Sequence, residues 1–326
     1  MTAPTIDQTI NKLNDIRTEL ARHIIGQQTV IDQTLTGILA GGHVMLMGVP
    51  GLAKTRLVEV TGTVLGLDTR RVQCTPDLMP ADVLGAEVLE QQADGTRHFR
   101  FIPGPVFCQF LMVDEINRAA PRTQSAFLQA MQEHEVSVNG INHPLPHPFH
   151  VLATRNPIEH EGTYPLPEAQ LDRFLLQVTI TYPDRDAERE ILRATTTGTT
   201  TPVANIITAP ELITMQEQVK TLPIGEKVID GIITLIRRLR PSDGDNNDSM
   251  PDVAPYLDYA PGVRATQSIS LAARAAALLD GRTAPSMDDV IALAPAVLSH
   301  RIQPNYRARA DGITMDALIA RATKGL

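Results

Sequence analysis

The sequence predicts an α/β fold, in which helices enclose a parallel β-sheet, joined to a smaller domain made only of helices. Short apolar runs alternate with helical segments up to about residue 180, and such runs suit strands that helices cover on both faces. A glycine-rich loop at residues 48–55 connects one of these runs to a helical segment. Beyond Tyr182 and Pro183 no strand-like run follows, so we expect the rest of the chain to be helical.

Two helices come first. Apolar residues at three- and four-residue spacing, from Ile6 to Leu20, describe an amphipathic helix that ends before Gly26. A second helix follows to about Ala40. The strands and helices of the sheet domain then come in the order HVMLM, TRLVEVTGTVLG, RRVQC, FLMVD, TQSAFLQAMQ, FHVLAT and FLLQVTI.

Two stretches break this alternation and predict hairpins near residues 86–102 and 135–146. EVLEQQADGTRHFRF carries Asp94-Gly95 between extended flanks, and EVSVNGINHPLP carries Asn139-Gly140. Asp-Gly and Asn-Gly pairs favour the tight turns that join antiparallel strands. We therefore expect two hairpins to project from the sheet domain.

The helical domain is expected at residues 185–326, after a sheet domain at residues 1–184 and a hinge near residues 183–186. The segments 195–205 and 241–252 have the composition of loops. Periodic apolar residues predict helices around 188–194, 210–219, 226–239, 266–279, 287–298 and 315–322.

Composition excludes several classes of protein. The 326 residues are 43% hydrophobic and carry a net charge of −8, with a pI of about 5.6, so nucleic acid is a poor partner. The start of the chain lacks the layout of a secretory signal, and no run of about 18 apolar residues occurs, which predicts a cytoplasmic protein that does not insert into membranes. Cys74 and Cys108 are the only cysteines, and they encode neither a disulfide framework nor a zinc site.

The loop GVPGLAKT, residues 48–55, nearly matches the phosphate-binding pattern G-x-x-x-x-G-K-[ST]. In that pattern, backbone N–H groups and the start of a helix face phosphates, Lys54 neutralises their charge and the Thr55 hydroxyl ligates magnesium. Ala53 replaces the second glycine, and we expect its methyl group to cost little if the backbone there is already helical. Taken alone, the loop could equally be an incidental turn.

Polar residues end two of the predicted strands. FLMVD is followed by Glu115, so Asp114 and Glu115 could bind magnesium and activate a water molecule, or form only a solvated acidic end. Asn156 ends VLATRN, where its amide could orient that water molecule beside a γ-phosphate. An Asn before Pro is otherwise a simple turn residue.

These motifs, in this order, resemble the MoxR branch of the AAA+ ATPases, which are P-loop NTPases with a helical lid. The resemblance covers residues 24–27 to 300–302 and rests on GVPGLAKT, TPDLMPADVLG, FRFIPGPVF, DEINRAAPRTQSAFLQAMQE, ATRNPIEHEGTYPLPEAQLDRF and VLSHRI. It implies ATP or ADP with Mg²⁺ as ligands, Ile25 and Gly26 near the adenine, and Thr55 and Asp114 at the metal. The phosphates would be held by Gly48, Val49, Pro50, Gly51, Leu52, Ala53, Lys54 and Thr55.

The same resemblance assigns two arginines. Arg173 resembles the arginine finger that enters a neighbouring subunit's site; without the family, a surface ion pair with Asp172 would be preferred. Arg264 resembles the second sensor, which contacts the γ-phosphate from the lid when the hinge closes over the phosphate loop. Relatives commonly have Ser-Pro before this arginine, whereas this chain has Gly262 and Val263.

The two hairpins resemble inserts that this branch shares with magnesium chelatase ATPase subunits; a role as ordinary edge hairpins is an equal alternative for substrate contact. Four histidines near the second hairpin lack the spacing of a metal site, and we interpret them as part of a solvated loop: His134, His143, His147 and His150.

Two functions remain open. The first is an ATP-hydrolysing ring, expected to be hexameric, that remodels a partner protein in a chaperone-like role. The second is an ATP-gated scaffold with little turnover. Glu115, Asn156 and Arg173 favour the first, because a scaffold needs no group that activates water. The acidic charge disfavours a DNA motor, and the resemblance implies a von Willebrand factor A domain protein as adaptor or client.

Overall fold

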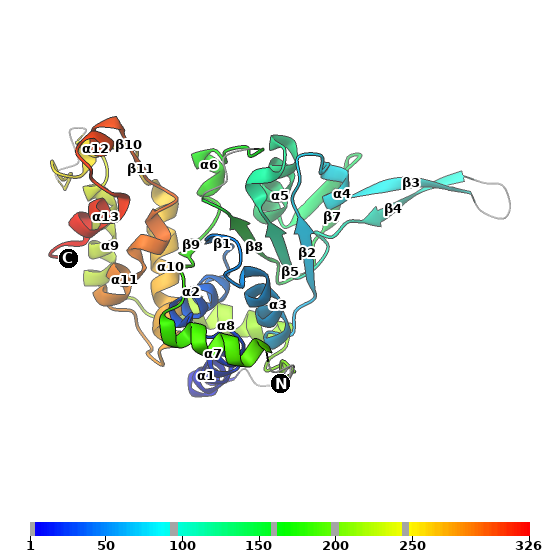
Figure 1. Ribbon diagram of the computed structural model, residues 1–326, viewed down its shortest axis with the longest axis horizontal. Helices are drawn as coiled ribbons and strands as arrows, with labels where there is room; N and C mark the ends of the chain where they lie inside the picture. The colour runs from blue at the N-terminus through cyan, green and yellow to red at the C-terminus, as the bar shows by residue number, and fades with distance from the viewer. Residues whose placement is uncertain (1–3, 92–96, 158–161, 197–201, 243–247) are drawn as a thin grey trace.

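The computed structural model describes residues 4–91, 97–157, 162–196, 202–242 and 248–326. A five-stranded sheet forms its centre, with the strand order β2-β5-β8-β1-β9 (Figure 1). Every pair of neighbouring strands is parallel, which confirms the predicted parallel sheet. The strands are β1 (Val44–Met47), β2 (Thr69–Gln73), β5 (Phe110–Asp114), β8 (His150–Arg155) and β9 (Leu176–Thr179).

Helices cover both faces of this sheet, and the alternation of side chains along each strand divides the core in two. Phe110 and Met112 of β5 pack in one cluster together with residues of the N-terminal helices. Leu111 and Val113 point to the other face and pack with Phe127 of α5. Because both faces are covered, all five residues of β5 are buried. The covering helices are α1 (Ile6–His23), α2 (Gln28–Leu39), α3 (Lys54–Val64) and α5 (Pro121–Glu133).

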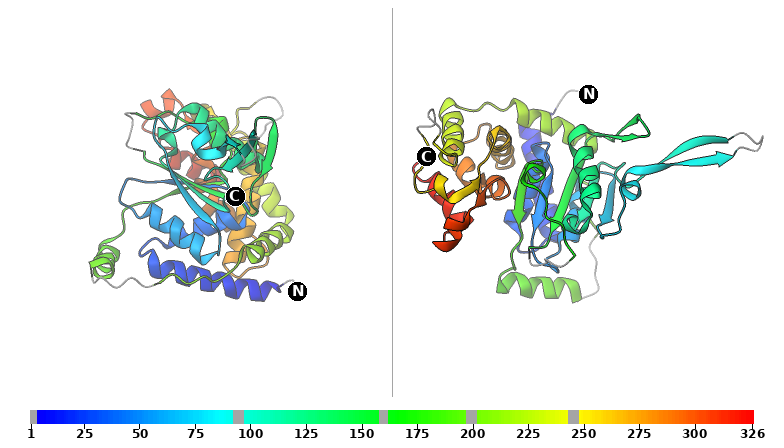
Figure 2. Two further views of the ribbon diagram at one scale, coloured as in Figure 1. Left: turned by 90° about the vertical axis from the view of Figure 1, so that its right-hand side faces the viewer. Right: turned by 90° about the horizontal axis from the view of Figure 1, so that it is seen from above.

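The two predicted hairpins are confirmed. The first, β3 (Gly85–Gln91) with β4 (Arg97–Pro103), projects far from the sheet domain as an arm (Figures 1 and 2). Its predicted Asp94-Gly95 turn lies outside the described residues. The second hairpin is β6 (Glu135–Val138) with β7 (Ile141–Pro144), joined by Asn139 and Gly140, which have φ of 50° and 82°. These positive φ values explain why Asn-Gly occurs there.

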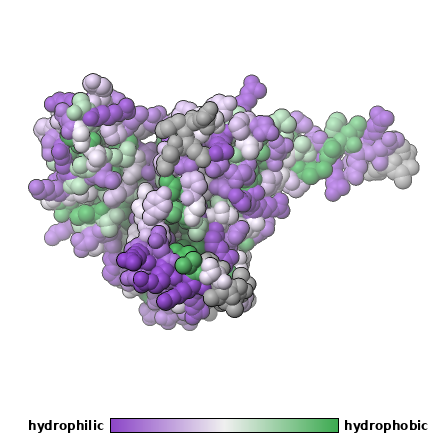
Figure 3. All heavy atoms as spheres, viewed as in Figure 1, coloured by the Kyte–Doolittle hydropathy of each residue, from purple (hydrophilic) through white to green (hydrophobic). Residues whose placement is uncertain are grey.

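The arm carries exposed apolar side chains, visible as green spheres along its length in Figure 3. Phe99 is 69% exposed and Leu89, its cross-strand partner, is 52% exposed. Near its base the arm contacts the second hairpin. The Phe101 ring stacks on His143 with centroids 4.0 Å apart, and Asn139 Nδ2 donates a hydrogen bond to Glu87 Oε2 at 2.7 Å. The two hairpins are therefore joined at this point.

The predicted helices of the second domain are present, and α10 and α11 pack closely against each other. The structure adds one short pair of strands, β10 (Leu257–Tyr259) with β11 (Gln303–Pro304), that the expectation of an all-helical domain does not include. Strands of two and three residues have no detectable periodicity. The helices are α9 (Glu226–Arg238), α10 (Val263–Leu279), α11 (Met287–Leu298), α12 (Tyr306–Ala310) and α13 (Met315–Thr323).

Two helices follow the expected hinge. Helix α8 (Ala209–Thr221) packs on α2 of the sheet domain, where the buried Gln216 Nε2 donates a hydrogen bond to Ile38 O at 2.8 Å. Helix α7 (Arg185–Thr196) lies on the opposite side of the sheet domain from α8 (Figure 2). Its Ala187 is buried and lies beside Gly26. A boundary at residue 184 remains a prediction. The remaining short helical segments are α4 (Pro80–Leu84), η1 (Ile116–Arg118), α6 (Glu168–Leu171) and η2 (Ala254–Tyr256).

Candidate functional site

The glycine-rich loop lies where the carboxyl end of β1 turns into α3. Lys54 and Thr55 are the first two residues of α3, so the loop faces the N–H groups of the helix start. The Lys54 ammonium donates a hydrogen bond to Gly48 O at 2.6 Å and thus lies across the loop. A cavity of about 560 Å³ opens here, lined by Pro50, Gly51, Ala53, Lys54, Thr55, Arg56, Glu59, Asp114 and Glu115. The phosphate-loop residues and the acidic strand end therefore share one cavity.

Ala53 does not have the helical backbone that we expect from the sequence. It is the residue before α3 and has φ of 55° and ψ of 24°, which is the left-handed conformation. The expectation that its methyl group lies on a helical backbone is therefore wrong. A residue other than glycine costs about 1–2 kcal/mol in this conformation, because Cβ approaches the following carbonyl oxygen. The loop keeps its turn at residue 53 despite this cost.

The acidic residues end β5, and neighbouring strands hold them in place. Arg71 Nη2 lies 2.6 Å from Asp114 Oδ2, and Gln73 Nε2 donates a hydrogen bond to Glu115 Oε2 at 2.9 Å. Arg118 Nε lies 3.1 Å from the same Glu115 oxygen. Sequence reasoning missed Arg71 and Gln73, because their roles depend on β2 pairing with β5.

Asn156 directly follows β8 and is buried, with 4% of its surface exposed. Strand β8 lies between β5 and β1 in the sheet. Since the carboxyl ends of parallel strands meet at one edge of a sheet, Asn156 lies between the acidic strand end and the phosphate loop. Ile25 and Gly26 lie in the turn between α1 and α2, where a Cβ at Gly26 would come within 2.4 Å of Ala187 Cβ on α7.

Arg173 and Arg264 are brought together, but away from the phosphate loop. Both line a second cavity of about 270 Å³ with residues that precede β1, including Gly42 and His43. The phosphate loop follows β1, and four residues of parallel strand span about 13 Å. The two arginines therefore lie at the end of the sheet where β1 begins, and Lys54 lies at the end where β1 finishes.

Asp172 pairs with arginines of the helical domain. Its Oδ1 accepts a hydrogen bond from Arg301 Nε at 2.7 Å, and its Oδ2 lies 3.6 Å from Arg264 Nη1. The neighbouring Arg173 Nε is buried and has no hydrogen-bond partner among the described residues. Helix α10 begins at Val263, so Arg264 lies in its first turn.

Arg301 joins the helical domain to the sheet domain at this point. Its side chain is 2% exposed, and burial lowers the pKa of its guanidinium from the ordinary value. The guanidinium also donates hydrogen bonds to the Ser268 hydroxyl and to the backbone carbonyls of Asp172, Phe174, Leu175 and Val297. These bonds satisfy the buried charge and hold α11 against the segment that carries Arg173.

The four histidines near the second hairpin do not behave alike. His150 is fully buried, so their description as a solvated loop is wrong for this residue. Its Nδ1 donates to Gly42 O at 2.9 Å, and burial lowers its pKa to about 4. His43, which lies beside it, has a pKa lowered to about 3, also by burial. Among the described residues, no group of three or more His, Cys, Asp or Glu side chains could hold a metal ion.

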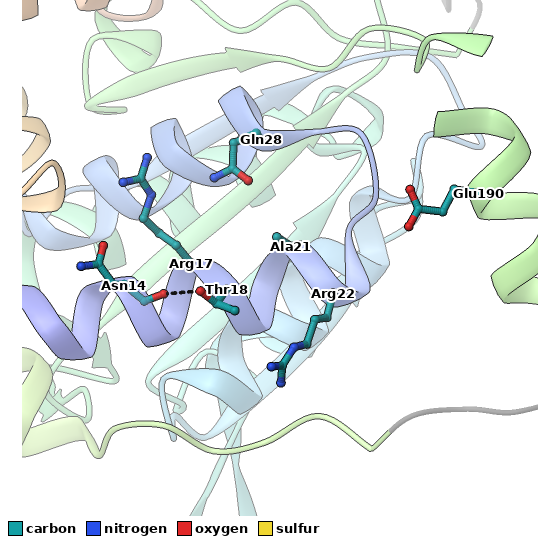
Figure 4. Close-up of a pocket in the computed structure, with 7 residues that line it drawn as sticks. All are labelled: Asn14, Arg17, Thr18, Ala21, Arg22, Gln28 and Glu190. Atoms are coloured by element: carbon teal, nitrogen blue, oxygen red, sulfur yellow. Dashed lines mark hydrogen bonds between the residues drawn. The ribbon is translucent and has the colours of Figure 1, made fainter. Parts of the chain in front are cut away.

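A larger cavity, of about 710 Å³, lies apart from these residues (Figure 4). It is an open groove between α1 and α7, with Glu190 facing it from α7. Its lining includes none of the residues that the sequence predicts to be functional: Asn14, Arg17, Thr18, Ala21, Arg22, Gln28 and Glu190. The residues that can bind phosphate or activate water line the smaller cavity at the phosphate loop, which is therefore the candidate functional site.

That smaller cavity has the donors that magnesium needs. Mg²⁺ is usually bound through one or two protein oxygens together with phosphate oxygens and water. Thr55 and Asp114, which carry a hydroxyl and a carboxylate, line the cavity together. These residues fit a magnesium ion that arrives with a nucleotide.

Comparisons with known proteins agree with this geometry. Residues 43–176 match the family described as "ATPase family associated with various cellular activities (AAA)", and residues 258–322 match the AAA lid domain. Chaperone MoxR1 of Mycobacterium tuberculosis is 41% identical, over 93% of this chain and 78% of the relative. Protein MoxR of Paracoccus denitrificans is 30% identical, over 95% of this chain and 94% of the relative.

A solved structure also matches. The crystal structure of a candidate ATPase from Cytophaga hutchinsonii is 35% identical, superimposes with a TM-score of 0.87, and covers 98% of this chain and 96% of its own. None of the helices in the described part of the chain is long and apolar enough to cross a membrane.

Proposed function

The chain belongs to the MoxR family of AAA ATPases, and on that basis we propose that it hydrolyses ATP in a ring of subunits and uses the energy to remodel a partner protein. One observation carries the proposal: Lys54, Thr55, Asp114 and Glu115 line a single cavity. A phosphate loop without a nearby carboxylate would support binding alone.

Each residue of the site has a separate proposed role in phosphoryl transfer. Lys54 and the N–H groups of the loop bind the phosphates, and Thr55 and Asp114 hold the Mg²⁺, whose charge offsets that of the phosphates. Glu115 accepts a proton from the attacking water molecule, which Asn156 orients. Ile25 and Gly26 are proposed to contact the adenine.

The position of the arginines supports the proposed ring. Arg173 and Arg264 lie at the sheet edge opposite the phosphate loop, so they suit a nucleotide bound by an adjacent subunit. A guanidinium supplied in this way raises the rate by roughly 10³–10⁵ in related phosphoryl-transfer systems. The family resemblance supports six subunits, so we propose a hexamer whose activity rises more steeply than linearly with protein concentration.

The partner is proposed from the family. The relative in Mycobacterium tuberculosis is named a chaperone, which supports a chaperone-like role. An adaptor or client with a von Willebrand factor A domain remains our expectation, as does a cytoplasmic location. An ATP-gated scaffold is the alternative outcome, and turnover decides between the two.

Two variants test the proposal. We expect Lys54→Ala to weaken ATP binding at least tenfold, because the phosphates lose a direct charge partner. Glu115→Gln should bind ATP normally but hydrolyse it at least about a hundredfold more slowly, because an amide cannot accept the proton. Calorimetry measures binding, and phosphate release measures turnover.

The exposed changes Lys220→Ala and Glu133→Gln serve as matched controls and should change neither quantity. Normal turnover in Glu115→Gln would rule out Glu115 as the base. Wild-type protein that binds ATP, forms rings and does not hydrolyse it would favour the scaffold.

A further inference from the structure

Thr154 is a buried residue of β8 that contacts both acidic residues of the site. Its side chain is fully buried, with 0% exposed. Its Oγ1 accepts a hydrogen bond from the Glu115 N–H at 2.8 Å and donates one to Asp114 Oδ1 at 2.6 Å. A hydroxyl group has one proton to donate and lone pairs to accept, so this one group serves both residues at once.

The backbone of Glu115 needs such support. It has φ of 55° and ψ of 53°, a left-handed conformation that is strained for a residue with a Cβ. Strain of this kind persists only where the surroundings hold the backbone in place. The bond from the Glu115 N–H to Thr154 restrains the backbone, and its acceptor, Thr154, is fully buried in the sheet.

The other contacts of the acidic pair differ in kind. They come from the longer side chains of Arg71, Gln73 and Arg118, and the two arginines are 48% and 38% exposed. Such side chains can rearrange when a nucleotide and its metal ion enter the cavity. Thr154 is short, buried and part of the central sheet, so its contacts stay in place.

Thr154, which contacts the acidic pair, also lies close to Asn156 along the chain. Thr154 lies in the last part of β8, and Asn156 directly follows the strand two positions later. Thr154 pairs across the sheet with Leu46 of β1, the strand that leads into the phosphate loop. One residue therefore connects the strands that carry the three parts of the site.

We propose that Thr154 is a positioning residue for hydrolysis, which holds Asp114 toward the metal site and Glu115 in its strained conformation opposite Asn156. This inference rests on the proposed ATPase function. Thr154 contacts the catalytic residues and is not assigned a contact with the nucleotide.

The test compares Thr154→Val, which removes the hydroxyl and keeps the shape, with Thr154→Ser, which keeps the hydroxyl. We expect Val to lower kcat by about tenfold or more, since it removes hydrogen bonds to a carboxylate and to a backbone N–H, while KM for ATP changes less than about twofold. Ser should recover kcat to within about threefold of wild type. Calorimetry of ADP with and without Mg²⁺ gives a second readout: Val should reduce the gain in affinity that Mg²⁺ provides, and Ser should restore it.

Thr34→Val is the matched control. Thr34 lies in α2, is 1% exposed, and its hydroxyl has no hydrogen-bond partner among the described residues. It should leave kcat and the Mg²⁺ effect unchanged. If Thr154→Val does not fold, Thr154→Cys replaces it, because a thiol is only a weak hydrogen-bond donor and acceptor.

Wild-type kcat and Mg²⁺ dependence in Thr154→Val would overturn the inference. So would an equal loss in Thr154→Ser, which would indicate a need for the methyl group and not for the hydroxyl. Wild-type protein without any ATP hydrolysis would instead overturn the proposed function, and in that case the Mg²⁺ effect on ADP binding still tests Thr154.

Discussion

Arg264 of the helical domain lies 3.6 Å from Asp172 of the sheet domain, in an ion pair next to Arg173. The Arg264 side chain is half exposed, and exposed ion pairs contribute little to stability, so it can leave Asp172 at small cost. Arg301 binds the same carboxylate from a buried position. The helical domain is thus held firmly at the place where Arg173 and Arg264 line one cavity.

The first prediction concerns Arg173. Arg173→Ala should bind ATP normally and lose hydrolysis by roughly 10³–10⁵, because the finger acts on the neighbouring subunit's nucleotide. Mixing it with Lys54→Ala should restore part of the activity, since mixed rings contain interfaces where an intact arginine meets an intact phosphate loop. Phosphate release from co-assembled rings measures this.

Arg309→Ala, an exposed change in α12, is the control and should keep full activity. A mixture that forms mixed rings and stays inactive would show that Arg173 does not act between subunits.

The second prediction decides which subunit Arg264 serves. Arg264→Ala mixed with Lys54→Ala should regain activity if Arg264 acts on the neighbour, as its place beside Arg173 favours. Lid closure over the chain's own phosphate loop, the expectation from sequence, would leave such a mixture inactive, because each subunit would lack either the arginine or the lysine. Hydrogen exchange around Arg301 with and without an ATP analogue gives an independent measurement: loss of protection there would support closure.

The third prediction concerns the backbone at Ala53. Ala53→Gly should raise the free energy of unfolding by about 1 kcal/mol, because glycine adopts φ of 55° without strain. Denaturant unfolding without nucleotide measures it. Ala320→Gly, in an exposed turn of α13, should have the opposite effect of similar size, because glycine weakens a helix interior. Equal destabilisation by both changes would contradict the left-handed conformation at residue 53.

The fourth prediction concerns pH. Burial lowers the pKa of His43 to about 3 and of His150 to about 4, below the ordinary value of 6.5. Backbone partners keep His43 neutral, since its Nε2 donates to Met131 O and its Nδ1 accepts from Val151 N–H. The folded pKa values lie below the unfolded ones, so this stability is present above about pH 6.5 and is lost as the pH falls toward 4.

Urea unfolding between pH 7.5 and 4.5 should show this decrease. His150→Gln should reduce the slope by up to about 1.4 kcal/mol per pH unit, which is the contribution of one proton. An unchanged slope in a folded variant would show that His150 does not titrate as the burial indicates.

Local patterns were sufficient for much of the fold. The five strands, both hairpins and most helices follow from apolar spacing and from turn residues such as Asn139 and Gly140, because these signals act within a few neighbouring residues. The phosphate loop and Asp114 were found in the same way. The short β10–β11 pair was missed, because its two strands lie more than 40 residues apart and are too short to show a period.

What only the tertiary structure decided is how the strand ends meet. The strand order β2-β5-β8-β1-β9 places Arg71, Gln73 and Thr154 against the acidic pair, although each lies about 40 residues from it in sequence. Folding also puts Arg301 on Asp172, 129 residues away. The sequence by itself determined which residues can carry the chemistry, because each motif is local. Their partners required the packed sheet, because hydrogen bonds between distant segments form only when buried strands lie side by side.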